Sequence, residues 1–483
     1  MGHTPIYHGV LVGVLAACLS ACGAERDRTN TTGSRALADR VEALVVPLVA
    51  ANEFSGAIVM ERGGQTVYAR GFGLANHAAA LAFTPDTPAD GGSLAKTFTA
   101  AGIWWLAHEG RIDLDAVVQR YVPEYPHSQT TVTQLLSHSN GLPPHYEFFD
   151  AFVGPGEVRT TAALLRIVAQ QAPRPSFAPG TQYEYSNLGF DAAALVIERA
   201  TGQSYEAFVK ERFFSRLKMP SSFARPARFA DWRGLRTAGY RWRDGNWELH
   251  DALDGEGFLG ASNLYFSAAD LARWGSANAS GAALPAPVVA AGQHQLSVGG
   301  QPIQITGLSW YCDRRKVRCN YSGHHAGFHD FVFWDRERNE AVAFVSNSSL
   351  PAWKIATLQR DLVSALAGRE ADVDPAATFL DVLELDPADV AGTYVAADIP
   401  VVTVTTVQQD GGFTVRLGNG QGYAAYPAGR QVLYVPGSDF YLAFSGDAAA
   451  RAMHVKAQEL NIVMRRSPRV SNEVAAPTPR QIP

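Results

Sequence analysis

Apolar side chains recur at helical spacing near the start of the chain and at strand spacing just after it. Between Ser34 and Ala51 they stand three and four positions apart, which predicts an amphipathic helix. Two runs rich in β-branched and aromatic residues follow, Gly56 to Glu61 and Gln65 to Phe72, separated by Arg62-Gly63-Gly64. Two such runs joined by a glycine turn predict a β-hairpin.

Helical patterns dominate the middle of the chain, from Lys96 to about Thr201, and strand patterns return late. Phe328 to Trp334 and Ala341 to Ser346 predict a second hairpin around a charged turn, and Trp353 to Leu366 predicts a closing helix. This order is explained by an antiparallel sheet that is assembled from both ends of the chain, flanked by helices and interrupted by an inserted helical region. The expected fold class is therefore α+β.

A different pattern begins after Gly368. Residues 369–383 have the composition of a linker, residues 384–466 alternate short β-rich runs with Gly and Asp turns, and residues 467–483 have few apolar anchors. We therefore expect a small, separate all-β domain, a barrel or a sandwich, followed by a flexible tail. The β-rich runs are Val401 to Val407, Gly412 to Leu417, Gln431 to Val435 and Phe440 to Phe444.

A short apolar run, Val10 to Ala21, stands where a secretory signal would be and is too short to cross a bilayer comfortably. It ends in Leu19-Ser20-Ala21-Cys22, which resembles the lipobox of bacterial lipoproteins. That resemblance implies a signal peptide over residues 1–21, a lipid anchor on Cys22, a polar tether over residues 22–33, and export to the periplasmic or cell-surface face of a bacterial membrane. The alternatives are lipidation at Cys18 and a plain secretory signal, and no Lys or Arg precedes Val10.

Composition narrows the class of protein. With 483 residues the chain has room for two or three domains, and its 47% hydrophobic and 18% charged residues exclude bulk disorder. A net charge of -5 without a lysine-rich run argues against a nucleic-acid partner. Four cysteines are too few for a disulfide scaffold, but Cys312 and Cys319 flank a predicted turn between strands. In an oxidising compartment we expect a disulfide between them, with two buried free thiols as the alternative.

The first candidate chemistry lies at Ser93 and Lys96, which follow Gly91-Gly92 at the start of a predicted helix. Residues three apart share a helix face, so the hydroxyl and the amine can lie within hydrogen-bond reach. A lysine whose pKa is lowered by burial can take the proton of a serine hydroxyl and make the serine nucleophilic. The N–H of Ser93 can also bind a developing oxyanion. Ser215 and Lys218 match the same pattern, but at a helix end without other chemical groups.

Two further segments carry candidate chemistry. Tyr185-Ser186-Asn187 places a phenol that can relay a proton beside an amide that can bind a carbonyl or a lysine. In Gly323 to Phe328, just before a strand, a histidine beside a glycine can face a cleft. The structural alternatives are a buried tyrosine in a loop for the first segment, and a turn or part of a metal site with His329 for the second. A metal site is disfavoured because only Asp330 stands nearby at ligand spacing.

Together the three motifs resemble those of the class C-like serine β-lactamases and penicillin-binding proteins, which use Ser-x-x-Lys, Tyr-x-Asn and a third motif of Lys-Thr-Gly or His-x-Gly. The resemblance covers about residues 34–368 and implies an α/β sandwich of the β-lactamase/transpeptidase type. Val390 to Tyr394 resembles the start of the lipocalin-like β domain that often follows. Framework segments that also match are Phe54 to Ala57, Gly71 to Gly73, Gly110 to Asp115, Leu135 to Pro143 and Asp270 to Trp274.

This resemblance implies a role for each site residue. Ser93 is the acylated nucleophile, Lys96 its activating partner, and Tyr185 the proton relay. His325 takes the place of the third-motif residue, with His324 as the alternative, because the stretch that follows looks shortened. The N–H groups of Ser93 and Phe328 form the oxyanion hole. The implied substrate-binding set is Asn187, His324, His325, Gly327 and Phe328.

The expected function is a serine hydrolase, an esterase or a peptidase, that forms a covalent acyl-enzyme with a small-molecule or peptide acyl substrate. Histidine is mostly neutral at pH 7, so β-lactamase activity, which benefits from a permanent cation for the substrate carboxylate, should be weak at most. A D-Ala-D-Ala carboxypeptidase and a class C-like β-lactamase are the alternatives within the enzyme class, and a non-catalytic ligand-binding or sensor protein is the alternative outside it. No metal, nucleotide or flavin cofactor is expected, and the oligomeric state stays open.

Overall fold

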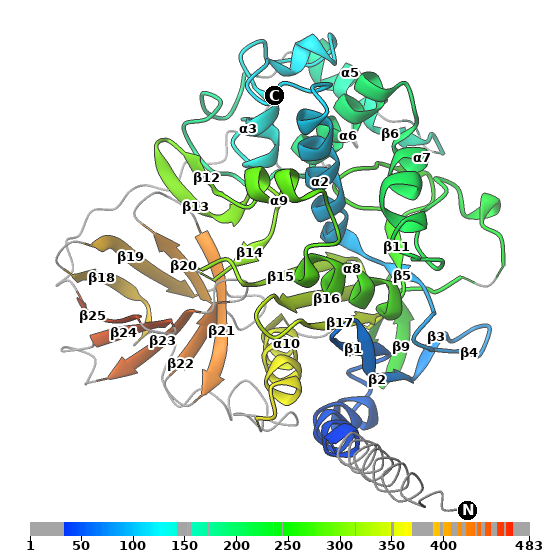
Figure 1. Cartoon of the computed structure of the whole chain (residues 1–483), viewed down its shortest axis with the longest axis vertical. Helices are drawn as coiled ribbons and strands as arrows, with labels where there is room; N and C mark the ends of the chain where they lie inside the picture. Colours follow the sequence, from blue (N-terminus) through cyan, green and yellow to red (C-terminus); the bar gives the residue numbers. More distant parts are fainter. Residues whose placement is uncertain are drawn as a thin grey trace, which may run out of the picture.

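The computed structural model describes residues 33–142, 174–234, 236–243, 245–313, 315–348 and 352–369, and, with short gaps, residues 152–171 and 390–466 (Figure 1). The expected signal peptide with Cys22, the tether up to residue 32, the linker from residue 370 and the tail over residues 467–483 lie outside the described residues.

The central element is an eight-stranded antiparallel sheet in the order β12-β13-β14-β15-β16-β17-β1-β2. The first hairpin joins the last one through β1 and β17, with Gly56 opposite Ser346. The prediction that both ends of the chain build one sheet is therefore confirmed. The strands are β1 (Gly56–Arg62), β2 (Gln65–Phe72), β12 (Gln295–Val298), β13 (Gln301–Thr306), β14 (Tyr311–Cys312), β15 (Arg318–His325), β16 (Phe328–Asp335) and β17 (Glu340–Ser346).

Helices cover both faces of the sheet. Successive strand residues point to opposite sides, so each strand contributes to the apolar contacts on both faces. Ile58 and Met60 of β1 belong to one apolar cluster with the predicted N-terminal helix, residues 33–50, and with α10 (Ala352–Leu366). Ala57 and Val59 belong to the other cluster, under α2 (Ala95–His108) and α8 (Ala268–Ser280). Figure 1 shows α2 and α8 on one side of the sheet and α10 on the other. The result is a three-layer α/β/α sandwich.

The inserted middle region is mainly helical, as predicted, but it also contains short strands that the sequence patterns did not indicate. Its further helices are α3 (Val132–Leu136), α5 (Thr161–Gln171), α6 (Asn187–Thr201), α7 (Tyr205–Val209) and α9 (Ala286–Gly292), with 3-10 turns η1 (Gly92–Leu94), η2 (Val118–Arg120) and η4 (Phe229–Asp231) and a π-helical turn η3 (Lys210–Ser215). Its short strands are β5 (Ala89–Asp90), β6 (Arg159–Thr160), β7 (Phe223–Ala224), β8 (Tyr240–Arg243), β9 (Asn246–Leu249), β10 (Glu256–Gly257) and β11 (Leu264–Phe266), and β3 (Leu74–Asn76) and β4 (Leu81–Ala82) precede it.

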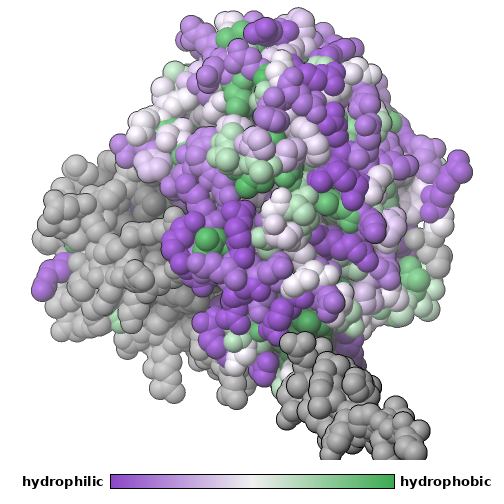
Figure 2. Space-filling view, viewed as in Figure 1, coloured by the Kyte–Doolittle hydropathy of each residue, from purple (hydrophilic) through white to green (hydrophobic). Residues whose placement is uncertain are grey.

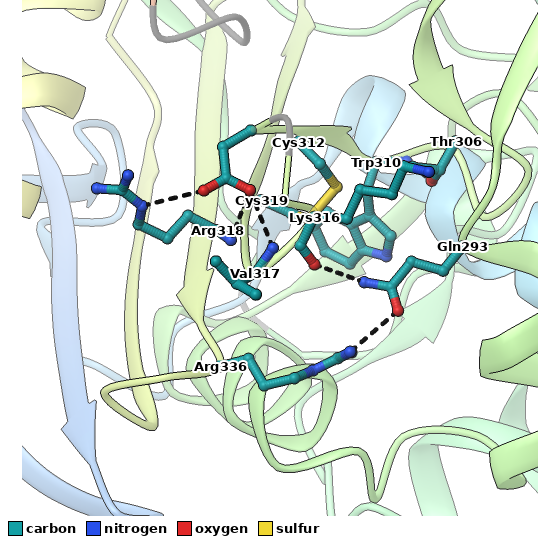
Figure 3. Close-up of a disulfide and its surroundings, with 10 residues drawn as sticks. Gln293, Thr306, Trp310, Cys312, Lys316, Val317, Arg318, Cys319 and Arg336 are labelled. Atoms are coloured by element: carbon teal, nitrogen blue, oxygen red, sulfur yellow. Dashed lines mark hydrogen bonds and ion pairs between the residues drawn. A yellow bond between two sulfur atoms is a disulfide. The ribbon is translucent and has the colours of Figure 1, made fainter. Parts of the chain in front are cut away.

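A disulfide joins Cys312 of β14 to Cys319 of β15, directly opposite each other in the register (Figure 3). The loop between them is braced by Asp313, which accepts from the N–H of Val317 at 2.9 Å and pairs with Arg318 at 3.3 Å. The disulfide therefore fixes the two-residue strand β14 against the start of β15, the strand that leads into the third motif.

The C-terminal segment is all β, as expected. Its strands pair antiparallel in chain order, and β25 pairs back with β18 through Tyr394 and Arg466. The lipocalin-like relationship stays a prediction, because strand pairing alone does not show it. The strands are β18 (Gly392–Ala396), β19 (Ile399–Thr406), β20 (Phe413–Leu417), β21 (Gly422–Gly429), β22 (Val432–Val435), β23 (Phe440–Ser445), β24 (Ala452–Ala457) and β25 (Leu460–Arg466).

Candidate active site

Ser93 lies in a tight turn between β5 and α2. Gly92 has φ +47°, a left-handed conformation that glycine adopts without strain, and its N–H donates to Asp90 Oδ1 at 2.9 Å. A Cβ atom on Gly92 would lie 2.8 Å from the backbone N of His324 on β15. The turn must therefore be glycine here, because it brings the Ser93 backbone directly against the third-motif strand.

The three predicted catalytic side chains meet at the Ser93 hydroxyl. Ser93 Oγ lies 2.7 Å from the Tyr185 hydroxyl and 3.0 Å from Lys96 Nζ. Lys96 is fully buried, and its Nζ also donates to Asn187 Oδ1 at 2.8 Å and to the carbonyl of Ala261 at 3.0 Å. The predicted contact between Asn187 and the lysine is therefore present, and the three polar partners surround the ammonium.

Burial moves the pKa values of Lys96 and Tyr185 in opposite directions. Desolvation lowers the pKa of Lys96 to about 7, against the opposing charge of Asp191. Desolvation raises the pKa of Tyr185 to about 12, although its hydrogen bonds to Ser93 and Tyr321 pull the other way. Near neutral pH a large share of Lys96 is a free amine that can accept a proton, while Tyr185 is a phenol that can donate one.

His138 holds Tyr185 in place, and the sequence analysis did not assign it a role. Its ring stacks on the Tyr185 ring at a centroid distance of 4.5 Å, and its Nδ1 accepts from the N–H of Ser186 at 3.1 Å. Desolvation and the nearby Lys96 charge lower the pKa of His138 to about 3, so it is a neutral acceptor. Ser186 in turn caps α6 by accepting from the N–H of Gly189 at 3.2 Å. These contacts position Asn187 as the first residue of α6.

The third-motif strand presents Tyr321 to the site, which the sequence analysis missed. Tyr321 is buried on β15 and hydrogen-bonds to Tyr185. The triplet Tyr321-Ser322-Gly323 has the spacing of Lys-Thr-Gly and His-x-Gly, and a Cβ on Gly323 would overlap the carbonyl of Gly91. Counted from this triplet, the motif is not shortened. The sequence signal that could have identified this triplet is Gly323, which precedes both histidines and lies four residues after Cys319.

His325 lies against two carboxylates, those of Asp90 and Glu256. Its Nδ1 lies 2.9 Å from Asp90 Oδ2, and its Nε2 lies 3.5 Å from Glu256 Oε2. Desolvation opposes protonation, but the charge and hydrogen bond of Asp90, followed by the charge of Glu256, outweigh it and raise the pKa of His325 to about 9. The expectation that this histidine is mostly neutral is therefore wrong, because the two carboxylates stabilise the imidazolium.

The neighbouring candidates shape the β15–β16 turn. The exposed His324 stacks on His329 at 4.2 Å, and its Nε2 lies 3.1 Å from the carbonyl of Ala326. Gly327 donates its N–H to the carbonyl of His250 at 2.7 Å. Phe328 is fully buried and stands opposite His325 in the ladder that closes the hairpin. Gly327 and Phe328 therefore dock this hairpin onto the body of the domain.

Neither a metal site nor a membrane-spanning helix occurs in the part of the chain that the structure describes. Among the residues it describes, no group of three or more His, Cys, Asp or Glu side chains could hold a metal ion. Within the same residues, no helix combines the length and apolar character needed to cross a bilayer.

Comparison with known proteins identifies the family to which the larger domain belongs. A family model described as Beta-lactamase matches residues 41–367. A penicillin-binding protein of Bacillus subtilis (strain 168) is 29% identical over 163 residues, which is 34% of this chain and 36% of the relative. The chain thus spans about a third of the length of the curated relatives it matches.

Two solved structures share the fold. The octameric penicillin-binding protein homologue from Pyrococcus abyssi has a TM-score of 0.61 at 21% identity, covering 88% of this chain and 99% of that one. A β-lactamase/D-alanine carboxypeptidase from Pseudomonas syringae has a TM-score of 0.55 at 21% identity, covering 69% of this chain and 99% of that one. At this identity the likeness shows the fold alone.

Proposed function

Because the chain belongs to the beta-lactamase family of serine hydrolases, we propose that it hydrolyses an ester or an amide through an acyl-enzyme on Ser93. One observation carries the proposal: Ser93 Oγ lies between Lys96 Nζ at 3.0 Å and the Tyr185 hydroxyl at 2.7 Å. A nucleophile between a buried amine and a buried phenol has both a proton acceptor and a proton donor within one hydrogen bond.

In acylation, neutral Lys96 is the base. A neutral amine has two N–H groups and one lone pair. The two N–H groups can donate to Asn187 and to the Ala261 carbonyl, which leaves the lone pair directed at Ser93. Lys96 then takes the Ser93 proton as Oγ attacks the acyl carbon, and Tyr185 donates its proton to the departing alcohol or amine.

In deacylation, the same groups act in reverse. The Tyr185 phenolate, stabilised by the Lys96 ammonium and by the Tyr321 hydroxyl, takes a proton from water, and the resulting hydroxide attacks the acyl carbon. The bond to Ser93 breaks and Lys96 returns its proton to Oγ. One water is consumed in each cycle and both groups regain their starting protonation states.

The second oxyanion donor is better placed on His324 than on Phe328. The backbone N of His324 packs against Gly92, next to Ser93, while Phe328 stands across the ladder from His325. N–H groups along a strand alternate between its two edges, and the pairing of β14 with β15 is through Cys319 and Asn320, before His324. We therefore assign the oxyanion hole to the N–H groups of Ser93 and His324, which keeps His324 in the substrate-binding set through its backbone.

The substrate class follows from the charges at the site. Two basic side chains of the described residues contact the Ser93 turn: Lys96 through Ser93 Oγ, and His325 through Asp90. Lys96 is fully buried and held by three partners, and the charge of His325 is balanced by Asp90 and Glu256. Tyr321 occupies the third-motif position with a neutral hydroxyl. A substrate carboxylate gains little here, so we propose esters or amides without one, with weak β-lactam hydrolysis.

A direct experiment tests this function. The purified protein is treated with a fluorophosphonate and with p-nitrophenyl esters, alongside Ser93→Ala, and the adduct is mapped by mass spectrometry. We expect labelling at Ser93 and ester turnover, both lost in the variant. Rapid turnover of a cephalosporin or of a D-Ala-D-Ala peptide would favour those alternatives. Ligand binding without label or turnover would favour a non-catalytic binding protein.

We also propose that the chain is lipid-anchored through Cys22, outside the described residues, and that its C-terminal sheet is lipocalin-like. The first proposal rests on Leu19-Ser20-Ala21-Cys22. Metabolic labelling with an alkyne fatty acid should mark the native chain and not Cys22→Ala. A solved structure of residues 384–466 would test the second proposal.

A further inference from the structure

We infer that His325 and Asp90 form a positioning pair that holds the Ser93 turn in its reactive geometry, and that the positive charge of His325 is required for this. The inference rests on the proposed function, since the reaction it serves is the acylation of Ser93. In this role neither residue touches the substrate, and for His325 this replaces the substrate contact expected from the sequence.

Asp90 links the histidine to the nucleophile. One carboxylate oxygen, Oδ1, accepts the N–H of Gly92 at 2.9 Å, and the other, Oδ2, contacts His325 Nδ1 at 2.9 Å. Asp90 is fully buried, so its charge needs a partner inside the protein. Gly92 directly precedes Ser93 and packs against β15. Movement of the Asp90 carboxylate would therefore shift the turn that positions Oγ.

The imidazolium also separates two acids. His325 Nε2 faces Glu256 Oε2 at 3.5 Å, and Glu256 is further paired with Arg225 at 3.6 Å. When His325 loses its proton, Asp90 and Glu256 are left with a neutral ring between them, and their repulsion acts on the turn. The charged and titratable groups that face His325 are Asp90 on β5, Glu256 on β10, Arg225 after β7 and His250 after β9. Asp330 on β16 and Tyr265 on β11 face Asp90.

The pH dependence has a defined sign. The carboxylates raise the pKa of His325 to about 9, so the pair is charged below that pH and loses its charge above it. Lys96, with a pKa lowered to about 7, must be neutral to act as the base. We expect kcat/KM to rise through about pH 7 with Lys96 and to fall through about pH 9 with His325.

Two variants test the pair. Asparagine at 325 keeps a neutral donor near the Nδ1 position, so His325→Asn should lower kcat at pH 7 about tenfold with little change in KM, and should remove the fall near pH 9. Asp90→Asn keeps an acceptor for Gly92 but removes the main charge that raises the pKa of His325. The fall of kcat/KM at high pH should then move to lower pH in Asp90→Asn. His294→Asn, at an exposed histidine after α9, is the matched control and should leave the profile unchanged.

The outcomes separate the inference from the proposed function. If His325→Asn keeps both the wild-type kcat and the fall of kcat/KM near pH 9, the inference is overturned while the esterase activity stands. If the wild-type chain neither turns over esters nor labels at Ser93, the proposed function fails. The pair is then judged by hydrogen–deuterium exchange of peptides spanning residues 89–94. Faster exchange in folded His325→Asn than in His294→Asn supports the pair, and equal exchange overturns it. If an NMR titration of the wild-type protein gave His325 a pKa below 7, the inference would be overturned even if the variants do not fold.

Discussion

At the residue scale, burial alone separates the roles of the two groups beside Ser93. Desolvation favours the neutral form of any ionisable group, so it lowers the pKa of Lys96 and raises that of Tyr185. The amine becomes a base and the phenol stays an acid at the same pH. Asp191 tempers the first shift, while Tyr321 and Ser93 temper the second.

Removing the charge of Asp191 should shift the pH at which kcat/KM rises on the acid side of the pH profile. Asp191 opposes the lowering of the Lys96 pKa, and its Oδ1 accepts from the N–H of Ala261 at 2.9 Å. Asp191→Asn keeps an acceptor for that N–H. We expect the rise of kcat/KM to shift to lower pH by about one unit. The exposed Asp115→Asn is the control, and an unmoved limb would contradict the assignment of Lys96 as the base.

Removing the Tyr321 hydroxyl should weaken Tyr185 as an acid. The hydrogen bond from Tyr321 lowers the Tyr185 pKa, so its loss in Tyr321→Phe raises that pKa further. We expect kcat to fall by about tenfold with the thermal midpoint little changed. Tyr311→Phe is the matched control, since its ring lies 5.5 Å from Tyr321 and its hydroxyl bonds to Tyr183 instead. Equal rates for the two variants would rule out the Tyr321 role.

At the element scale, close backbone contacts position the site. The turn after β5 packs on β15, and neither Gly92 nor Gly323 leaves room for a Cβ atom. β15 is itself stapled to β14 by the Cys312–Cys319 disulfide, which keeps Tyr321 and Gly323 in register with the turn.

Loss of the disulfide should therefore cost stability more than chemistry. Closing so short a loop stabilises a fold by roughly 2–3 kcal/mol. We expect the double variant Cys312→Ala/Cys319→Ala to lose about that much free energy of unfolding in urea, with kcat within about threefold of the wild type at 25 °C. Reducing agent should reproduce the loss in the wild type and leave the variant unchanged. A variant as stable as the wild type would show that β14 needs no staple.

At the scale of the whole molecule, the sheet depends on pairing between residues nearly 300 positions apart. β1 lies between β2 and β17. On the face that Figure 2 shows, the described residues are mostly hydrophilic with scattered apolar patches. The apolar cluster below the sheet includes Leu37 and Val41 from the first helix and Leu362 from the last. Both ends of the domain are thus needed to cover one face.

Truncation tests this dependence. A chain ending at Arg369 keeps every residue of both apolar clusters in the catalytic domain, whereas one ending at residue 351 loses Ile355, Leu358 and Leu362. We expect the first to unfold cooperatively and to hydrolyse esters, and the second to be unfolded or aggregated, as judged by circular dichroism and thermal melts. A folded shorter chain would show that α10 is dispensable.

The sequence by itself determined the longer elements and the candidate nucleophile. Periodicity located the first helix, both hairpins and α10, because these elements bury one regular face. Ser93 and Lys96 could be paired because residues three apart share a helix face, whereas Tyr185 and Asn187 were joined to them by the resemblance of the three motifs to one family. The Cys312–Cys319 disulfide could be expected because the two cysteines, seven residues apart, flank a predicted turn between strands.

Only the tertiary structure shows which side chain of β15 contacts Tyr185. The choice between His324, His325 and Tyr321 depends on which side of β15 faces Tyr185, and a strand pattern does not reveal which neighbour each face meets. The charge of His325 depends on Asp90 and Glu256, which are distant along the chain and adjacent in space. Electrostatic environment is a property of the assembled core, so the sequence could not show that these residues touch.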